Sequence, residues 1–295
     1  MRKRNLSVSL VFISCLVMFS AVAGAARTQS TGLTGSAADF ERAKFDKSST
    51  YISNQWLPLR PGLQLTYKGS AIPEGAKTRS TRRVVTTVTD LSKWIDGVRT
   101  LVIWERDFTA GKLGESELAF FAQDKAGNVW LLGEYPEEYE NGKFTEAPTW
   151  ISGRKGARAG IAMLANPRLG SPDYAQGFAP SPVEFEDRAR VYRKDQKTCV
   201  PDECYEHVLV IEEFEKGEPG IFHLKYYAPN VGLVRVGWRG ANEIEKETLE
   251  LVKRQQLGLK ALAKVRKEAL KLDKRAYKRS EVYSNTPPAK QLKEG

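Results

Sequence analysis

The sequence lacks the motifs of the common catalytic and metal sites. Its 295 residues include only two histidines and three cysteines. There is no nucleophile elbow, phosphate-binding loop, dinucleotide fingerprint or zinc-protease helix. Segments that would form helices do not alternate with segments that would form strands, and no segment repeats, which argues against a parallel α/β fold and a repeat array. We therefore expect no cofactor and no bound metal.

Two of the three cysteines predict a disulfide bond. Cys199 and Cys204 enclose four residues that include a proline, a spacing that fits a disulfide across a turn in an exported protein. A metal site that adds His207 is the alternative. On an extended strand, however, Cys204 and His207 would point to opposite faces, and His223 is the only other histidine. The spacing therefore favours the disulfide.

The N-terminal segment predicts export. Three basic residues, an apolar run and an exit of small residues are typical of a secretory signal peptide, which we place at residues 1–25. An uncleaved membrane anchor is the alternative, but the small residues favour cleavage. Residues 26–38 are small and polar, so we expect a disordered linker. The protein would then act in the periplasm or the medium, or as a lipoprotein if Cys15 were lipidated.

The formal net charge of +10 comes from the two ends of the chain. Residues 253–295 contain thirteen basic and four acidic residues, whereas residues 27–252 are slightly acidic. Apolar residues recur at spacings of three and four over residues 253–280, which predicts an amphipathic helix. Residues 281–295 are expected to be flexible, with Tyr283 as a candidate tether. The basic side of the helix carries Lys260, Lys264, Lys267, Lys271, Lys274 and Lys278.

Three roles are open for this basic helix. It could pack its apolar seam on an exposed sheet face, lie on an anionic membrane surface, or bind a nucleic acid or another acidic partner. The seam is rich in alanine and lacks tryptophan and phenylalanine, which favours packing on the sheet. Nucleic acid is the less expected of these partners.

Residues 39–252 are predicted to form a mainly β domain. The dominant hydrophobic period is two, and we expect about ten short strands joined by tight turns. An antiparallel meander of that size must curl into an open barrel or fold into a sandwich. The fold class is therefore one large, strongly curved antiparallel sheet followed by the basic helix.

A hairpin over residues 118–135 is the predicted centre of this sheet. Asp124 and Gly127 have the chemistry of a three-residue turn, and pairing of Asp124 with Asn128 sets the register. The expected faces carry, on one side, Phe121, Ala119, Val129, Leu131 and Tyr135 and, on the other, Ala122, Phe120, Leu118, Trp130, Leu132 and Glu134. Both faces are mostly apolar, so each needs a cover.

Large apolar side chains in and beside this hairpin are the candidate ligand-binding residues. They are Trp104, Phe120, Trp130, Leu132 and Tyr135. The six tryptophans of the chain could line a cavity for a sugar or a lipid. The alternative is that they are core residues, which is the commoner role of tryptophan in a β domain.

Carboxylates are the only candidate acid–base groups. Glu134 follows apolar hairpin residues, where burial would favour its protonated form, and Glu105 and Asp107 share a face of a neighbouring strand. A hydrolase could use Glu134 with Glu105 or Asp107 as an acid–base pair. The alternative places Glu134 at the open end of the hairpin, where the alternation returns to solvent.

One loop is rich in glycine and basic residues. Residues 153–160 include Arg154, Lys155 and Arg158 and could cradle a phosphate through their backbone amides. No strand and helix N-terminus visibly flank the loop, so a solvated surface loop is the favoured alternative.

Three stretches resemble motifs of an uncharacterised family of exported bacterial proteins. They read NQWLPLRPG (residues 54–62), AQDKAGNVWLLGEY (122–135) and YYAPNVGLVRV (226–236). Asn230 stands where the family motif would have glycine, and asparagine also tolerates a left-handed turn. The resemblance implies a bacterial envelope or secreted setting for most of residues 39–252, and it brings no catalytic residues.

The sequence as a whole favours a non-catalytic envelope protein. We expect it to bind an apolar or amphiphilic ligand, or a protein partner, within a curved sheet. The alternatives are a hydrolase built on Glu134 with Glu105 or Asp107, and a protein that binds a membrane surface or an acidic partner through the basic helix. The oligomeric state is left open.

Overall fold

The computed structural model describes residues 39–73 and 75–292. The expected signal peptide, the linker and Cys15 lie outside the described residues. In chain order the elements are η1 (Arg42–Lys44), β1 (Leu63–Ala71), β2 (Ser80–Ile95), β3 (Val98–Thr109), β4 (Lys112–Gln123), β5 (Val129–Glu140), β6 (Lys143–Phe144), β7 (Trp150–Ile151), β8 (Arg158–Met163), β9 (Tyr174–Ala175), β10 (Gly177–Phe178), β11 (Arg188–Cys199), β12 (Cys204–Phe214), β13 (Phe222–Ala228), β14 (Gly232–Arg239), β15 (Thr248–Gln256), α1 (Leu259–Arg279), α2 (Glu281–Ser284) and β16 (Lys290–Gln291).

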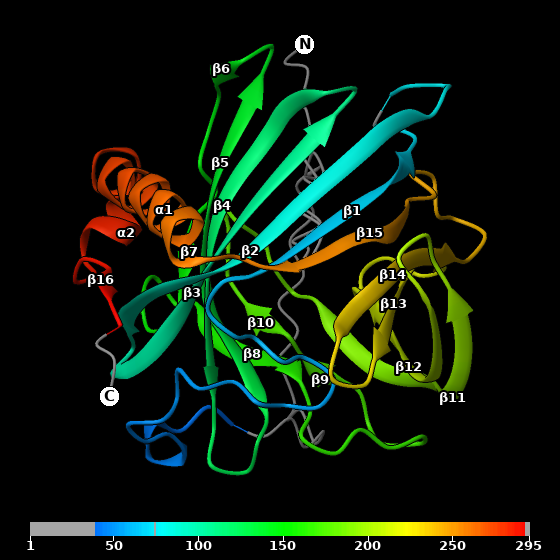
Figure 1. Ribbon diagram of the computed structural model, residues 1–295, viewed down its shortest axis with the longest axis horizontal. Helices are drawn as coiled ribbons and strands as arrows, with labels where there is room; N and C mark the ends of the chain where they lie inside the picture. The colour runs from blue at the N-terminus through cyan, green and yellow to red at the C-terminus, as the bar shows by residue number, and fades with distance from the viewer. Residues whose placement is uncertain (1–38, 74, 293–295) are drawn as a thin grey trace, which may run out of the picture.

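The strands form one antiparallel sheet that curls into a nearly closed barrel (Figure 1). Their order is β10-β8-β5-β4-β3-β2-β1-β15-β14-β13-β12-β11-β9. The two end strands, β9 and β10, are consecutive in the chain, and the backbone of residues 175–177 passes against Gly160 of β8. A Cβ on Gly160 would lie 2.2 Å from the backbone nitrogen of Gly177, so this approach requires glycine.

The prediction of a mainly β, strongly curved sheet is confirmed, whereas the strand count of about ten is too low. Within residues 39–73 and 75–292 the sheet contains sixteen strands. Several of the additional strands are only two residues long, too short to establish an alternating pattern. Strand β8 begins within the segment predicted to be a glycine-rich loop, and β9 and β10 lie in a segment rich in proline and glycine.

The turn of the central hairpin has the predicted register. The backbone N–H of Asp124 donates to the carbonyl of Asn128 at 2.9 Å, and the Asp124 carboxylate accepts from the N–H of Ala126 at 2.9 Å. The same carboxylate accepts from Trp130 Nε1 at 2.8 Å. Asp124 therefore closes the turn and also satisfies the one polar atom of a buried indole.

A bulge then changes which residues share a face. Beyond Phe121 the pairing shifts by one residue, so that Ala119 lies opposite Glu134 and Leu118 lies opposite Tyr135. The backbone of Gly133 has φ +153°, and a Cβ there would lie 2.7 Å from the carbonyl of Trp150. The predicted faces of Glu134 and Tyr135 are therefore wrong, because an inserted residue inverts the alternation.

The disulfide prediction is confirmed. Cys199 and Cys204 are bonded at the end of the β11–β12 hairpin, where the two residues pair across the strands. His207, which the metal alternative required, is exposed and lies beside Asp195. The link closes a short loop and should contribute about 2 kcal/mol to stability in the chain-entropy description.

The basic helix packs on the outside of the sheet, as one of its three predicted roles requires (Figure 1). Ala269, Leu272 and Ala276 of α1 are fully buried, and the helix contacts β2 and β4. All six lysines of the opposite side are exposed to solvent. Among the residues that the structure describes, no helix has the length and apolar character to cross a membrane.

A buried lysine anchors the helix and the segment that follows it. Lys93 of β2 donates to Asp273 at 3.1 Å, to the hydroxyl of Tyr277 at 2.9 Å and to the carbonyl of Pro287 at 2.6 Å. Its ammonium lies 4.1 Å from the ring centre of Tyr283, and the Tyr283 hydroxyl also donates to Asp273, at 2.7 Å. Burial lowers the pKa of Lys93 to about 8, although Asp273 opposes that shift.

The prediction of a flexible end after residue 280 is therefore wrong for the part that the structure describes. Tyr283 is fully buried and contacts Tyr135, with ring centres 4.9 Å apart. Strand β16 then pairs with β2 through Lys290 and Gln291. The partners that order this segment lie about 200 residues earlier in the chain or on α1, so its local composition does not reveal them.

Replacing Asp273 by alanine is expected to lower the free energy of unfolding by about 3 kcal/mol, because the buried ammonium of Lys93 would lose its carboxylate. Urea unfolding followed by circular dichroism measures the change. The double variant Lys93→Met, Asp273→Leu should be less destabilised than Asp273→Ala alone, since no buried charge remains. Lys271→Met, which removes an exposed lysine of the same helix, is the control. An equal loss in Asp273→Ala and in the control would contradict the anchoring role.

Candidate functional site

One end of the barrel is lined by buried ionisable side chains. Strand alternation places Glu105 and Asp107 of β3 on the face opposite α1, and they pair across the sheet with Glu117 and Glu115 of β4. We call the set of buried residues at this end the acidic cluster. It comprises Arg82, Glu105, Asp107, Glu115, Glu117, Glu134, Asp187, Glu213, Lys225 and Glu247.

Several members of the acidic cluster have defined partners within the sheet. Arg82 forms an ion pair with Asp107 and lies 3.8 Å from Glu247. On the other side of the barrel, Lys225 lies 3.1 Å from Glu213. These pairs bring opposite charges together across neighbouring strands, which is the arrangement that a buried charge requires.

Four carboxyl groups of the acidic cluster, those of Asp107, Glu115, Asp187 and Glu247, are harder to ionise than carboxyl groups in water, because burial raises their pKa values. Burial raises the pKa of Asp107 to about 7, with Arg82 opposing the shift and Glu247 adding to it. Burial and then the charge of Glu138 raise the pKa of Glu115 well above its usual value. The barrel end can therefore hold protons on carboxyl groups near neutral pH, and a protonated carboxyl can donate a hydrogen bond.

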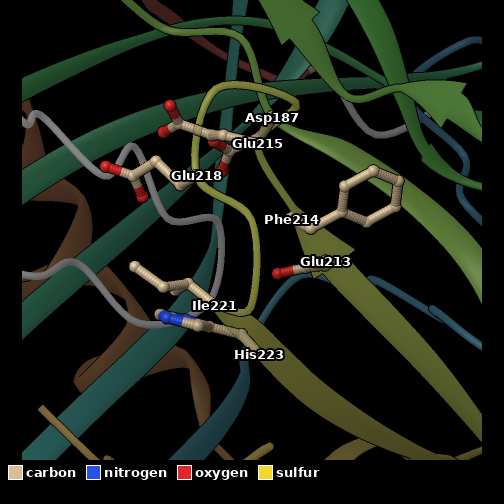
Figure 2. Close-up of a pocket in the computed structure, with 7 residues that line it drawn as sticks. All are labelled: Asp187, Glu213, Phe214, Glu215, Glu218, Ile221 and His223. Carbon is tan, nitrogen blue, oxygen red and sulfur yellow. The ribbon is translucent and has the colours of Figure 1, made fainter. Parts of the chain in front are cut away.

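A small cavity beside the acidic cluster contains a carboxyl pair. Figure 2 shows Asp187 and Glu215 pointing toward one another, with Glu218 nearby. The cavity has a volume of about 20 Å³, and its lining residues come from the β12–β13 hairpin and from the segment before β11. A space of this size holds about one water molecule. It is too small for an organic ligand.

Asp187 and Glu215 form a hydrogen-bonded carboxyl pair. Burial raises the pKa of Asp187 well above its usual value, and the neighbouring charge of Glu215 and a hydrogen bond to it raise the pKa further. Burial raises the pKa of Glu215 to about 7, while the hydrogen bond with Asp187 opposes this shift. These directions mean that Asp187 carries the proton and donates it to Glu215.

His223 lies at the opposite wall of this cavity and pairs with Glu243 (Figure 2). Its Nε2 is 3.3 Å from the Glu243 carboxylate. Burial lowers the pKa of His223, but the hydrogen bond and charge of Glu243 outweigh it, and the net shift is upward. In residues 39–73 and 75–292, no group of three or more His, Cys, Asp or Glu side chains is arranged to hold a metal ion.

The residues of this cavity were not predicted as a site. Glu213 could have been found, because strand geometry places it on the same face as the apolar residues Leu209 and Ile211. Asp187 lies outside any regular strand, and Glu215 belongs to a charged turn that reads as solvated surface. Their proximity depends on closure of the barrel, which local patterns do not encode.

The predicted ligand-binding side chains all lie on the outer face of the sheet. Phe120 and Tyr135 pack against Tyr283 of α2. Trp130 packs edge-on against Phe40 and Phe45 of the N-terminal segment. The register places Leu132 and Trp104 on this face as well, with Leu132 fully buried and Trp104 Nε1 donating to Ser116 at 3.0 Å. Segments of the chain itself therefore contact Phe120, Trp130 and Tyr135.

The predicted catalytic carboxylates share the inner face but belong to separate local contacts. Glu134 accepts from Trp150 Nε1 at 2.7 Å, and Glu105 accepts from the Thr86 hydroxyl at 2.6 Å. Strand β4 lies between the strands that carry them, which separates the two backbones by about 10 Å. Glu134 is also displaced along the strand direction. It lies opposite Ala119 of β4, whereas Glu105 lies opposite Glu117. This arrangement gives the acid–base hypothesis no added support.

Comparison with known proteins finds two solved structures with low similarity to this chain. No model of a protein family matches the chain, and no curated protein is similar to it in sequence. A candidate exported protein with a YmcC-like fold from Bacteroides fragilis aligns with 68% of this chain and 99% of its own, with a TM-score of 0.41 and 13% identity. A candidate lipoprotein from Parabacteroides distasonis aligns over the same shares, with a TM-score of 0.36 and 11% identity. Likeness at this level assigns neither family nor function.

The carboxyl pair predicts a specific pH dependence of stability. Folding raises the pKa of Glu215 from 4.5 to about 7, so its contribution is fully present below pH 4.5 and is lost as the pH rises through about 7. Glu215→Gln keeps a neutral group at all pH values. The free energy of unfolding of this variant, relative to the unmodified protein, should therefore increase between pH 5 and pH 8, as measured by urea unfolding.

The control for this experiment is Glu206→Gln, the same chemical change at an exposed position of β12. It should follow the pH profile of the unmodified protein. If Glu215→Gln also follows that profile, the hydrogen-bonded carboxyl pair of Asp187 and Glu215 is refuted.

Proposed function

We propose that this protein is an exported, non-catalytic module that binds an amphiphilic ligand on the inner side of its curved sheet. The observation that carries the proposal is the division of the inner face into two parts. Toward one end, β3 and β4 present Leu101, Ile103 and Phe121, and toward the other they present Glu105 and Asp107. A ligand with an apolar body and a polar head matches this order.

The acidic cluster indicates the chemistry of the polar head. Its eight carboxyl groups outnumber its two cationic side chains, Arg82 and Lys225. Burial raises the pKa of Asp107 to about 7, so that a polar head would meet hydrogen-bond donors as well as acceptors. A cationic or hydroxyl-rich head suits such a surface better than an anionic head, which the carboxylates would repel.

Export is part of the same proposal. The disulfide between Cys199 and Cys204 is of the kind that persists in oxidising compartments. The basic, apolar and small-residue order of residues 1–25 is that of a secretory signal. We therefore infer a role in the cell envelope, in the periplasm or outside the cell.

Protein purified from a bacterial periplasm is expected to carry a co-purifying amphiphile, detected by native mass spectrometry and identified after solvent extraction. Ala119→Leu adds bulk to the inner face of β4 and should reduce the amount retained. Ala122→Leu adds the same atoms to the outer face of the same strand and serves as the matched control. Both substitutions overpack a buried site and should lower the free energy of unfolding by about 1–3 kcal/mol. A greater loss of ligand from Ala119→Leu than from Ala122→Leu would therefore show that the ligand binds on the inner face.

Absence of any bound amphiphile from the folded, periplasmic protein would contradict the proposal. Equal loss of ligand from Ala119→Leu and Ala122→Leu would also contradict binding on the inner face.

We propose the basic side of α1 as a second binding surface, for anionic membrane lipids. All six of its lysines are exposed while the apolar seam is buried on the sheet, so the helix can meet a membrane surface without detaching. Attraction to anionic lipid contributes about 1 kcal/mol for each lysine near the surface. Because α1 exposes one large apolar side chain, Leu259, beside six lysines, such binding would be mainly electrostatic and weakened by salt.

Replacing Lys260, Lys264 and Lys267 by glutamine should reduce binding to phosphatidylglycerol vesicles about 100-fold, measured by co-sedimentation. The control variant replaces Lys112, Lys143 and Lys197, three exposed lysines on strands. Phosphatidylcholine vesicles, which carry no net charge, should bind neither the unmodified protein nor the variants. Comparable binding by the two triple variants would rule out the helix as the membrane-binding surface.

A further inference from the structure

A second pocket lies at the turn between β2 and β3, apart from the acidic cluster. Its volume is about 270 Å³, close to the lower end of the range for small-molecule sites. Four segments that are distant in sequence meet there: the N-terminal η1, the β2–β3 turn, the loop after β7 and the segment after α2. Its polar and aromatic lining includes Arg42, Trp94, Asp96, Ser152 and Arg154.

Trp94 differs from the other tryptophans of the chain. Its side chain lines this pocket and is 54% exposed, whereas Trp56, Trp130 and Trp150 are each at most 8% exposed. An exposed indole beside a polar pocket presents a flat, electron-rich face to solvent. The C–H groups of a sugar ring, which carry partial positive charge, stack on such a face.

Two arginines line the same pocket and are held in place by the backbone. Arg42 Nε donates to the carbonyl of Asp96 at 2.6 Å, and its guanidinium pairs with the Asp96 carboxylate. Arg154 donates to the carbonyl of Asn285 at 2.8 Å. A guanidinium has five N–H donors, so these contacts leave donors on both arginines for a ligand. The lining has one more cation than anions.

The carboxylate of Asp96 is already bound by other residues of the pocket. It pairs with Arg42 and accepts from the Ser152 hydroxyl at 2.9 Å. Two glycines allow this close assembly. A Cβ on Gly97 would lie 2.9 Å from Arg42 Cδ, and one on Gly153 would lie 2.8 Å from Asp96 Cγ, and both glycines have φ near +75°. Any residue other than glycine at position 97 or 153 would therefore strain the wall of the pocket.

From these features we propose that the pocket binds an acidic saccharide, a pyranose ring that carries a carboxylate. The ring stacks on Trp94, and its carboxylate accepts from Arg42 and Arg154. Arginine suits this role because its planar fork matches the two oxygens of a carboxylate. The inference stands apart from ligand binding in the sheet interior, because it uses none of the residues of the acidic cluster.

Isothermal titration of the full chain with trigalacturonate tests the proposal. Saturable binding is expected, and Trp94→Ala and Arg154→Gln should each weaken it about tenfold or more. Maltotriose, which has the same ring type without a carboxylate, should bind at least about tenfold more weakly than trigalacturonate. Tyr51→Ala removes an aromatic side chain that is 69% exposed outside the pocket lining and should leave binding unchanged.

Three results would overturn the proposal. They are the absence of saturable binding up to about 10 mM trigalacturonate, unchanged binding by both pocket variants, and equal affinity for maltotriose. Circular dichroism and the unfolding midpoint show whether each variant is folded. Since Arg154 is exposed and Trp94 is more than half exposed, neither substitution removes a core contact.

Discussion

Closure of the sheet accounts for most of the other features of this fold. In an open antiparallel sheet, the polar face of a strand can remain in water, but in a nearly closed sheet one side of every strand is turned inward. Here that side carries Arg82, Asp107, Glu213 and Lys225, which pair within the barrel. Burial still raises the pKa of Asp107 to about 7 despite Arg82. The polar interior and the raised pKa of its carboxyl groups thus have one cause.

The outer face of the same sheet requires a cover of a different kind. Most of its large side chains on β4 and β5 are apolar, and two separate segments contact them. Tyr283 of α2 packs on Phe120 and Tyr135, while Phe40 and Phe45 pack on Trp130. The narrow seam of alanine and leucine is sufficient to pack α1 on the sheet, so the lysines of the helix can remain in solvent.

Features set by neighbouring residues could be predicted from the sequence, whereas features set by distant contacts could not. The Asp124 turn, the Cys199–Cys204 disulfide and the helix seam depend on residues a few positions apart. The bulge at Gly133 depends on the approach of the Trp150 carbonyl, and it reverses the faces assigned to the two residues that follow. The Asp187–Glu215 pair likewise exists only because the segment before β11 meets the β12–β13 hairpin.

Lys93 and Trp94 invert the usual rule that charge is outside and aromatic rings are inside. Adjacent strand residues point to opposite faces, so the position that buries Lys93 under α1 turns Trp94 toward the pocket at the β2–β3 turn. The two are also connected through the chain terminus. Lys93 donates to the carbonyl of Pro287, and Pro287 lines the pocket of Trp94. The buried ion pair that fixes the C-terminal segment therefore also builds one wall of the pocket, which couples the stability of the fold to the shape of this site.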